Sequence, residues 1–190
     1  MRRLLALLLI LLLSSACGAE GESGPYESYT TFPFTHYASG STIEEYQAVI
    51  LFEQANETFT AYQVSYPSCT CRDPMSNTNM VAYVEILNSR EDPNTAAIRK
   101  ITFGENKGLW GDSNPNYFIA EYTEEYYDEN LVQPLVGLTK GEVDEWEGYG
   151  THVSLLTPDA LAGATVSSSN LQSMLRSLMD YHVDNYYGAE

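Results

Sequence analysis

Residues 167–182 read SSSNLQSMLRSLMDYH, and this stretch decides the fold. Six of its side chains recur at intervals of three and four residues, which places them on one face of an α-helix. They are Leu171, Met174, Leu175, Leu178, Met179 and His182. Ser167 or Ser168 is expected to cap the helix, because a serine hydroxyl accepts hydrogen bonds from the free N–H groups there. We therefore expect an amphipathic helix near the C-terminus.

Three segments upstream of this helix predict β-strands. Residues 59–66 are aromatic and β-branched and end at Pro67. Residues 81–87 and 98–103 have the same character. The loop between the last two, residues 88–94, is short, so we expect these strands to be antiparallel neighbours.

The remaining elements are expected to be helical. The spacing of apolar residues over 42–54, with Thr42 as a possible N-cap, predicts a helix. Pro115 can open a further helix through Tyr126. Residues 131–138 and 140–146 predict one or two short helices. Together these elements predict a single α+β domain with a small antiparallel sheet and flanking helices.

The N-terminal segment has the order of a secretory signal. Arg2 and Arg3 are basic, residues 4–13 are apolar, and Ser14-Ser15-Ala16 precedes Cys17. This arrangement resembles the lipobox of bacterial lipoproteins, in which the cysteine is lipidated and the signal is cut just before it. The resemblance implies a signal peptide over residues 1–16 and a lipid on Cys17. The alternative is an ordinary cleaved signal followed by an incidental cysteine.

Composition predicts a tether and excludes one class of partner. Residues 17–40, rich in Gly, Ser, Thr and Glu, are expected to form a lipid-anchored flexible tether to a domain spanning 41–190. The formal charge is −17, and loss of Arg2 and Arg3 with the signal makes it −19. Such an acidic surface repels phosphate backbones, so we do not expect nucleic-acid binding. It suits basic or cationic partners.

The segment that indicates chemistry is DALAGATVS, residues 159–167. It resembles the signature of FMN-binding domains in the peripheral flavin subunits of Rnf complexes and of sodium-pumping NADH:quinone reductase. In that family a flavin transferase joins FMN by a phosphoester to the final threonine of Gly-Ala-Thr. The resemblance covers residues 80–183 and implies five cofactor-binding residues. They are Thr165 as the attachment site, the small residues Ala164 and Gly163, the acidic Asp159, and Ser167 as a hydroxyl donor.

The local sequence agrees with a phosphate site on physical grounds. Thr165 lies just before the predicted helix, where free N–H groups and the positive end of the helix dipole favour an anion. Gly163 permits close approach of the cofactor. Ala160 and Ala162 depart from the family signature, which has Gly and then Ser or Thr at these places.

The resemblance implies an extracytoplasmic electron carrier with covalent FMN. It would take electrons from a membrane-bound donor and pass them to an unknown acceptor. Two alternatives stay open. One is a cofactor-free surface lipoprotein that binds a ligand or protein partner. The other is a flavin reductase that acts on an external acceptor.

Other chemistry-bearing residues give weaker signals. Cys69 and Cys71 are compatible with a strained disulfide, two free thiols, or half of a metal or intermolecular site. His36, His152 and His182 are scattered without ligand spacing, so no metal site is predicted. No Gly-x-Ser-x-Gly or Ser/His/Asp order is present, so no catalytic residue is predicted.

Overall fold

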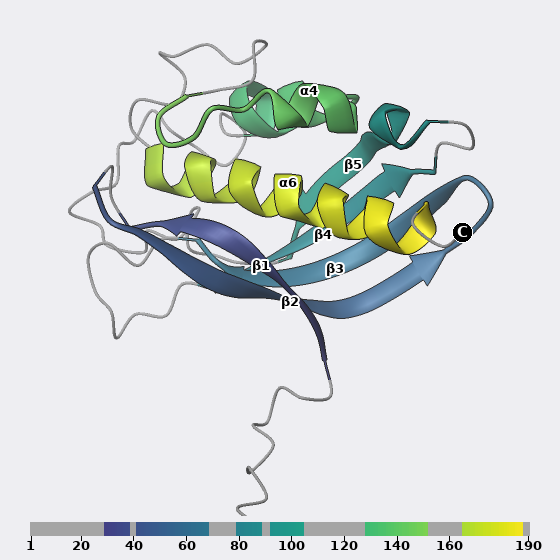
Figure 1. Cartoon of the computed structure of the whole chain (residues 1–190), viewed down its shortest axis with the longest axis horizontal. Helices are drawn as coiled ribbons and strands as arrows, with labels where there is room; N and C mark the ends of the chain where they lie inside the picture. The colour runs from purple at the N-terminus through teal and green to yellow at the C-terminus, as the bar shows by residue number, and fades with distance from the viewer. Residues whose placement is uncertain are drawn as a thin grey trace, which may run out of the picture.

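The protein has an α+β fold built on one antiparallel sheet (Figure 1). The computed structural model describes residues 29–38, 41–68, 79–88, 92–104, 128–151 and 165–187. The strands are β1 (Thr30–Tyr37), β2 (Ile43–Ala55), β3 (Phe59–Pro67), β4 (Asn79–Leu87) and β5 (Ala97–Phe103). They follow one another across the sheet in chain order. The predicted fold class is confirmed.

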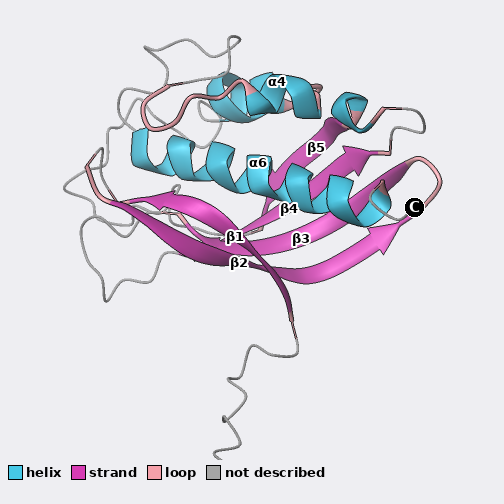
Figure 2. Ribbon diagram, in the orientation of Figure 1, coloured by secondary structure: helices cyan, strands magenta, loops and turns pink. Residues whose placement is uncertain are grey.

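One long helix covers one face of this sheet (Figure 2). The helical elements are η1 (Pro93–Thr95), η4 (Asp128–Val132), α3 (Gln133–Leu135), α4 (Lys140–Asp144) and α6 (Thr165–Tyr186). We call the side of the sheet under α6 the inner face and the opposite side the outer face. Short helices are predicted over residues 131–138 and 140–146, and the structure has the short elements η4, α3 and α4 there.

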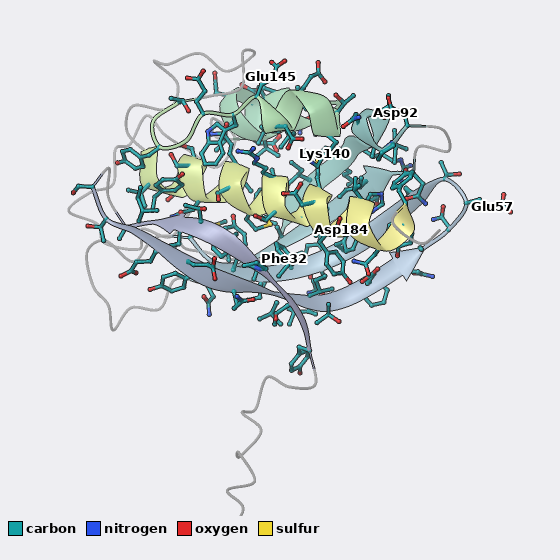
Figure 3. The ribbon with its side chains drawn as sticks, viewed as in Figure 1. Phe32, Glu57, Asp92, Lys140, Glu145 and Asp184 are labelled. Carbon is teal, nitrogen blue, oxygen red and sulfur yellow. The ribbon has the colours of Figure 1, made fainter. Side chains whose placement is uncertain are left out.

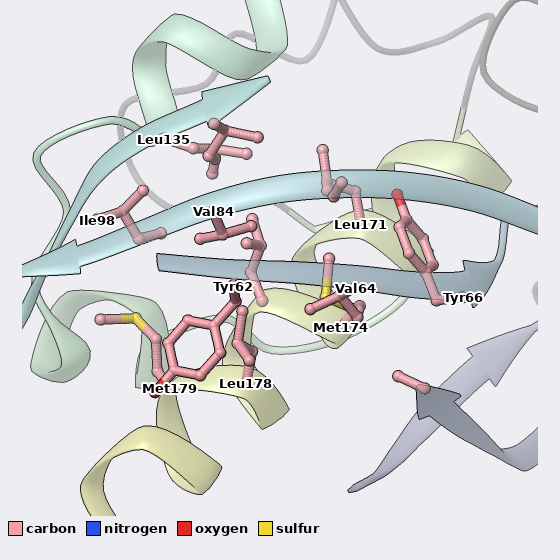
Figure 4. Close-up of a cluster of buried hydrophobic side chains, with 14 of the residues drawn as sticks. Tyr62, Val64, Tyr66, Val84, Ile98, Leu135, Leu171, Met174, Leu178 and Met179 are labelled. Carbon is pink, nitrogen blue, oxygen red and sulfur yellow. The ribbon is translucent and has the colours of Figure 1, made fainter. Parts of the chain in front are cut away.

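The core lies between α6 and the inner face (Figure 4). Strands β3, β4 and β5 occupy the predicted segments, and β4 and β5 are antiparallel neighbours as expected. The predicted stripe of α6 is buried along its whole length. It packs on inward-pointing strand residues such as Tyr62, Val64, Tyr66, Val84 and Ile98. Each of these side chains contributes about 1.5–3 kcal/mol by burial.

The predicted helix over residues 42–54 is wrong, because this segment forms strand β2. Ala48 and Ile50 point inwards, as period-two alternation requires. A bulge between Ile50 and Phe52 then adds one residue, and Glu53 is the next to face α6. That extra residue shifts the phase of the alternation. The resulting spacing resembles a helical one.

The predicted tether over residues 17–40 is too long. Residues 30–37 form β1, so the folded part begins before residue 41. Phe32, Phe34 and His36 are buried and alternate with exposed residues, which is the period of a strand. Composition averaged over the segment hides this alternation. Pro33 fits here because β1 is an edge strand.

The predicted serine cap of the last helix is also wrong. α6 begins at Thr165, two residues before the earliest expected cap, Ser167. Ser168 and Ser169 lie inside the helix and are fully buried. Their small side chains allow the first turns of α6 to pack closely in the structure. The helix predicted over residues 115–126 lies outside the described residues.

Charged side chains join α4 to α6 (Figure 3). Lys140 Nζ lies 2.5 Å from Asp144 Oδ2 on α4 and 2.8 Å from Asp180 Oδ1 on α6. Burial lowers the pKa of Lys140, but the hydrogen bonds to both carboxylates outweigh it, so the net pKa is raised. Lys140 therefore stays protonated and holds the two helices together.

Candidate functional site

The predicted cofactor site falls at the N-terminal end of α6. Thr165 is the first residue of this helix, and Ser167 lies in its first turn with 7% of its surface exposed. Asp159, Gly163 and Ala164 lie outside the described residues. A helix of this length has free N–H groups and a positive dipole end at its start. The start of a helix is a position that suits an anionic group.

Asn170 fixes the first turns of α6 to the sheet. The Tyr37 N–H donates to Asn170 Oδ1 over 2.7 Å, and Asn170 Nδ2 donates to the Tyr37 carbonyl over 3.0 Å. Asn170 Nδ2 also donates to the Ser68 carbonyl. One buried amide thus joins the end of β1, the residue after β3 and the helix. These bonds replace the backbone partners that the strand ends lack.

A glycine-rich turn lies against the same end of the helix. Gly148 and Gly150 have φ values of 119° and 72°, which favour glycine. The Gly150 N–H donates to Ser169 Oγ over 3.3 Å. The Tyr37 ring packs against the neighbouring aromatic rings of Trp146 and Tyr149, with centroids 5.9 Å and 5.6 Å away. This end of α6 is therefore held by polar and aromatic contacts together.

Two buried polar side chains near this end lack hydrogen-bond partners in the described part of the chain. They are His36, at both ring nitrogens, and Ser68, at Oγ. Burial lowers the pKa of His36, opposed by the Glu44 carboxylate and by the Ser68 backbone. His36 is therefore neutral at pH 7. We call His36, Tyr37, Ser68 and Asn170 the N-terminal cluster. Unpaired buried groups of this kind cost free energy unless water or a ligand meets them.

A second polar group lies under the C-terminal end of α6. Tyr62 Oη and His182 Nδ1 are hydrogen-bonded at 2.8 Å, and both side chains are buried. Glu53 accepts hydrogen bonds from Tyr181 over 2.9 Å and from Tyr186 over 2.6 Å. We call these five residues the C-terminal cluster. The bulge in β2 places Glu53 on this side of the sheet.

The histidine and tyrosine rings of the C-terminal cluster are uncharged at pH 7, and they surround the side chain of Glu53. Burial lowers the pKa of His182 to about 4. Burial and the hydrogen bond to Glu53 raise the pKa of Tyr181 to about 12. Burial also raises the pKa of Tyr62 well above its usual range. These groups keep their protons fixed at neutral pH, so they serve to hold α6 rather than to exchange protons.

Sequence reasoning missed most of this arrangement. Asn170 lies 133 residues from Tyr37 and 102 from Ser68, so no local pattern indicates their contact. His182 was assigned correctly to the buried stripe, but its partner Tyr62 is 120 residues away. The predicted lipid site Cys17 lies outside the described residues, as do Cys69 and Cys71.

Two kinds of feature are absent from the described residues. No helix among them is long and apolar enough to cross a membrane. No group of three or more His, Cys, Asp or Glu side chains among them is placed to hold a metal ion. Comparison with protein-family models, curated proteins and solved structures finds no match to this chain.

Proposed function

We propose that this protein is an extracytoplasmic electron carrier that holds FMN covalently on Thr165 and is anchored to the membrane by lipid on Cys17. The observation that carries the proposal is that Thr165 is the first residue of α6. A phosphate is stabilised at such a position by free backbone N–H groups and by the helix dipole. The resemblance of residues 159–167 to an FMN-attachment signature supplies the cofactor.

The residues around this end of α6 fit a phosphate group. In a chain with a formal charge of −17, backbone donors can neutralise phosphate where a cationic pocket is lacking. The hydroxyl of Thr165 would form the phosphoester, and the N–H groups of the first turn would bind the phosphate oxygens. FMN would supply the ability to accept electrons and pass them on.

The chain's own residues supply position and rigidity. Asn170 and the Lys140 ion pairs fix α6 against the sheet and against α4. An attachment point on a fixed helix keeps the distance to a donor or acceptor constant. A phosphoester keeps the cofactor in place without a deep pocket. These properties suit a relay between proteins better than an enzyme with its own substrate.

In-gel fluorescence tests the proposal directly. The full chain, produced together with an exported flavin transferase, should be yellow and should fluoresce in a denaturing gel. Thr165→Ala should abolish the fluorescence, because the acceptor oxygen is lost. Thr102→Ala, at an exposed threonine of β5, is the matched control and should retain it. Fluorescence in Thr165→Ala would refute the attachment site. A colourless wild-type protein would favour the cofactor-free binding lipoprotein instead.

A further inference from the structure

The outer face of the sheet carries most of the large hydrophobic side chains that are exposed. Six such side chains are exposed among the described residues: Tyr29, Ile43, Leu51, Phe52, Tyr83 and Tyr186. Four of them, Ile43, Leu51, Phe52 and Tyr83, point outwards from β2 and β4, with exposed fractions between 42% and 59%. Exposed apolar residues on a protein surface are normally scattered singly, whereas a concentration on one face indicates a contact surface.

The bulge in β2 concentrates this apolar surface. Because of the extra residue, Leu51 and Phe52 are both exposed although they are consecutive. Phe52 is paired with Gln63, and Gln63 is paired with Tyr83, so the three form one row across the sheet. Gln63 Nε2 donates to Tyr83 Oη over 2.9 Å, which keeps the phenol lying along the face.

The outer face is also nearly neutral in a strongly acidic protein. Its outward-pointing strand residues include two carboxylates, Glu45 and Glu85, and two cations, Arg99 and Lys100. Arg99 pairs with Glu85 and lies over the ring of Phe59, 4.4 Å from its centroid. The whole chain has a formal charge of −17. An anionic surface therefore repels the outer face less than the net charge of the whole chain would suggest.

The first described strand begins on the side of the sheet that carries the outer face. In Figure 1 the N-terminal end of β1 lies below the sheet, on the side away from α6. Cys17 precedes Tyr29 by twelve residues, which span at most about 40 Å when fully extended. A lipid on Cys17 would hold the domain within that distance of the bilayer.

We propose that the outer face lies on the surface of the phospholipid bilayer. Tyrosine and phenylalanine side chains favour the boundary between headgroups and acyl chains, because a ring has an apolar body and, in tyrosine, a polar end. A weak apolar contact becomes effective when a lipid keeps it at high local concentration. The inference rests on the lipid anchor in the proposed function and is independent of the flavin. It leaves α6 and Thr165 facing away from the membrane.

Tryptophan quenching by brominated lipid tests this orientation. The full lipidated chain is reconstituted in phosphatidylcholine vesicles with and without brominated acyl chains. Phe52→Trp places a reporter on the outer face, and Asn185→Trp places one at an exposed position of α6 as the matched control. The wild-type signal, from two native tryptophans, is subtracted. Emission at position 52 should fall by about half with brominated lipid, since the ring would reach the acyl boundary, and emission at position 185 should not change.

Two controls keep the interpretation unambiguous. Tyr83→Trp, in the same row across the sheet, should repeat the result for position 52. Equal emission with both lipids at positions 52 and 83 would overturn the proposed orientation. Vesicle flotation is measured on the same samples, with Cys17→Ala as the unlipidated control. Flotation without quenching refutes the orientation alone, whereas loss of flotation by the wild-type chain refutes the anchor as well.

Discussion

The two ends of α6 each bury a histidine, but they treat it differently. At the C-terminal end His182 is hydrogen-bonded to Tyr62, and the neighbouring Glu53 accepts two tyrosine hydroxyls. At the N-terminal end His36 and Ser68 Oγ have no hydrogen-bond partner in the described part of the chain. His182 Nε2 has no partner in the described part of the chain either, but the other hydrogen bonds of the C-terminal cluster fasten the helix. The N-terminal cluster combines a fixed backbone with unmet polar groups, which is the better place for a ligand.

The largest expected effect comes from removing the amide that fastens the N-terminal end. Asn170→Ala leaves the Tyr37 N–H and the carbonyls of Tyr37 and Ser68 buried without a partner. We expect a loss of about 3–5 kcal/mol in the free energy of unfolding, measured by urea denaturation. The exposed Asn185→Ala should cost less than about 0.5 kcal/mol. Similar costs for both would mean that this end is not fixed by Asn170.

Acid should weaken the C-terminal end. The pKa of His182 is about 4 in the folded protein against 6.5 ordinarily, so the unfolded state binds the proton more tightly. The free energy of unfolding is therefore highest above pH 6.5 and falls as the pH drops towards 4, by about 3 kcal/mol from this residue. Burial of His36 acts in the same direction.

His182→Asn isolates the contribution of His182 to the pH dependence. Asparagine retains a polar group near Tyr62 Oη but does not titrate. Urea denaturation between pH 4 and pH 7.5 should give a shallower pH slope for the variant than for the wild-type chain. Identical slopes would show that other groups cause the acid sensitivity.

A smaller effect is expected from the phenol of Tyr62. Tyr62→Phe leaves His182 Nδ1 buried without its partner, so we expect a loss of about 1–2 kcal/mol in the free energy of unfolding. Thermal unfolding followed by circular dichroism measures the change. Tyr83→Phe, on the exposed outer face, is the control and should have little effect. An unchanged stability for Tyr62→Phe would show that the hydrogen bond between Tyr62 and His182 does not stabilise the fold.

The smallest effect is expected at Glu53, which is partly exposed. Glu53→Gln keeps an acceptor for one tyrosine but removes the charge that both hydroxyls share. We expect a loss below about 1 kcal/mol, because solvent weakens charge interactions there. The same variant should lower the pKa of Tyr181, since the carboxylate helps to raise it. An unchanged ultraviolet titration of the tyrosines would contradict this account.

Sequence patterns predicted the elements whose periodicity is uninterrupted. Strands β3 and β4 and the stripe of α6 follow from alternation or from helical spacing. Strand β5 is the exception, because Arg99 and Lys100 are both exposed and its prediction rested on its β-branched and aromatic residues. Strand β2 was misassigned because its bulge breaks the alternation after Ile50. Strand β1 was missed because its period lies within a segment of loop-like composition. In both cases the local sequence favours another structure, and pairing with the neighbouring strands determines the one that forms.

The candidate site was predictable only in part. Residues 159–167 indicate an attachment point, and the start of α6 near Thr165 follows from the helix that comes after it. The partners that fix this end are far away in the chain, with Tyr37 and Ser68 more than one hundred residues from Asn170. Neither the buried state of His36 nor its missing partner is visible in a single sequence. These properties arise only when the sheet and α6 pack together.

The last element of the chain covers the first. Tyr37 of β1 obtains its hydrogen-bond partner from Asn170, so the first strand cannot be completed until almost the whole chain has emerged. Synthesis proceeds from the N-terminus, and the apolar inner face of the sheet stays uncovered during that interval. Contacts this distant along the chain also make folding slow. The nascent protein therefore exposes apolar surface that favours aggregation until α6 docks.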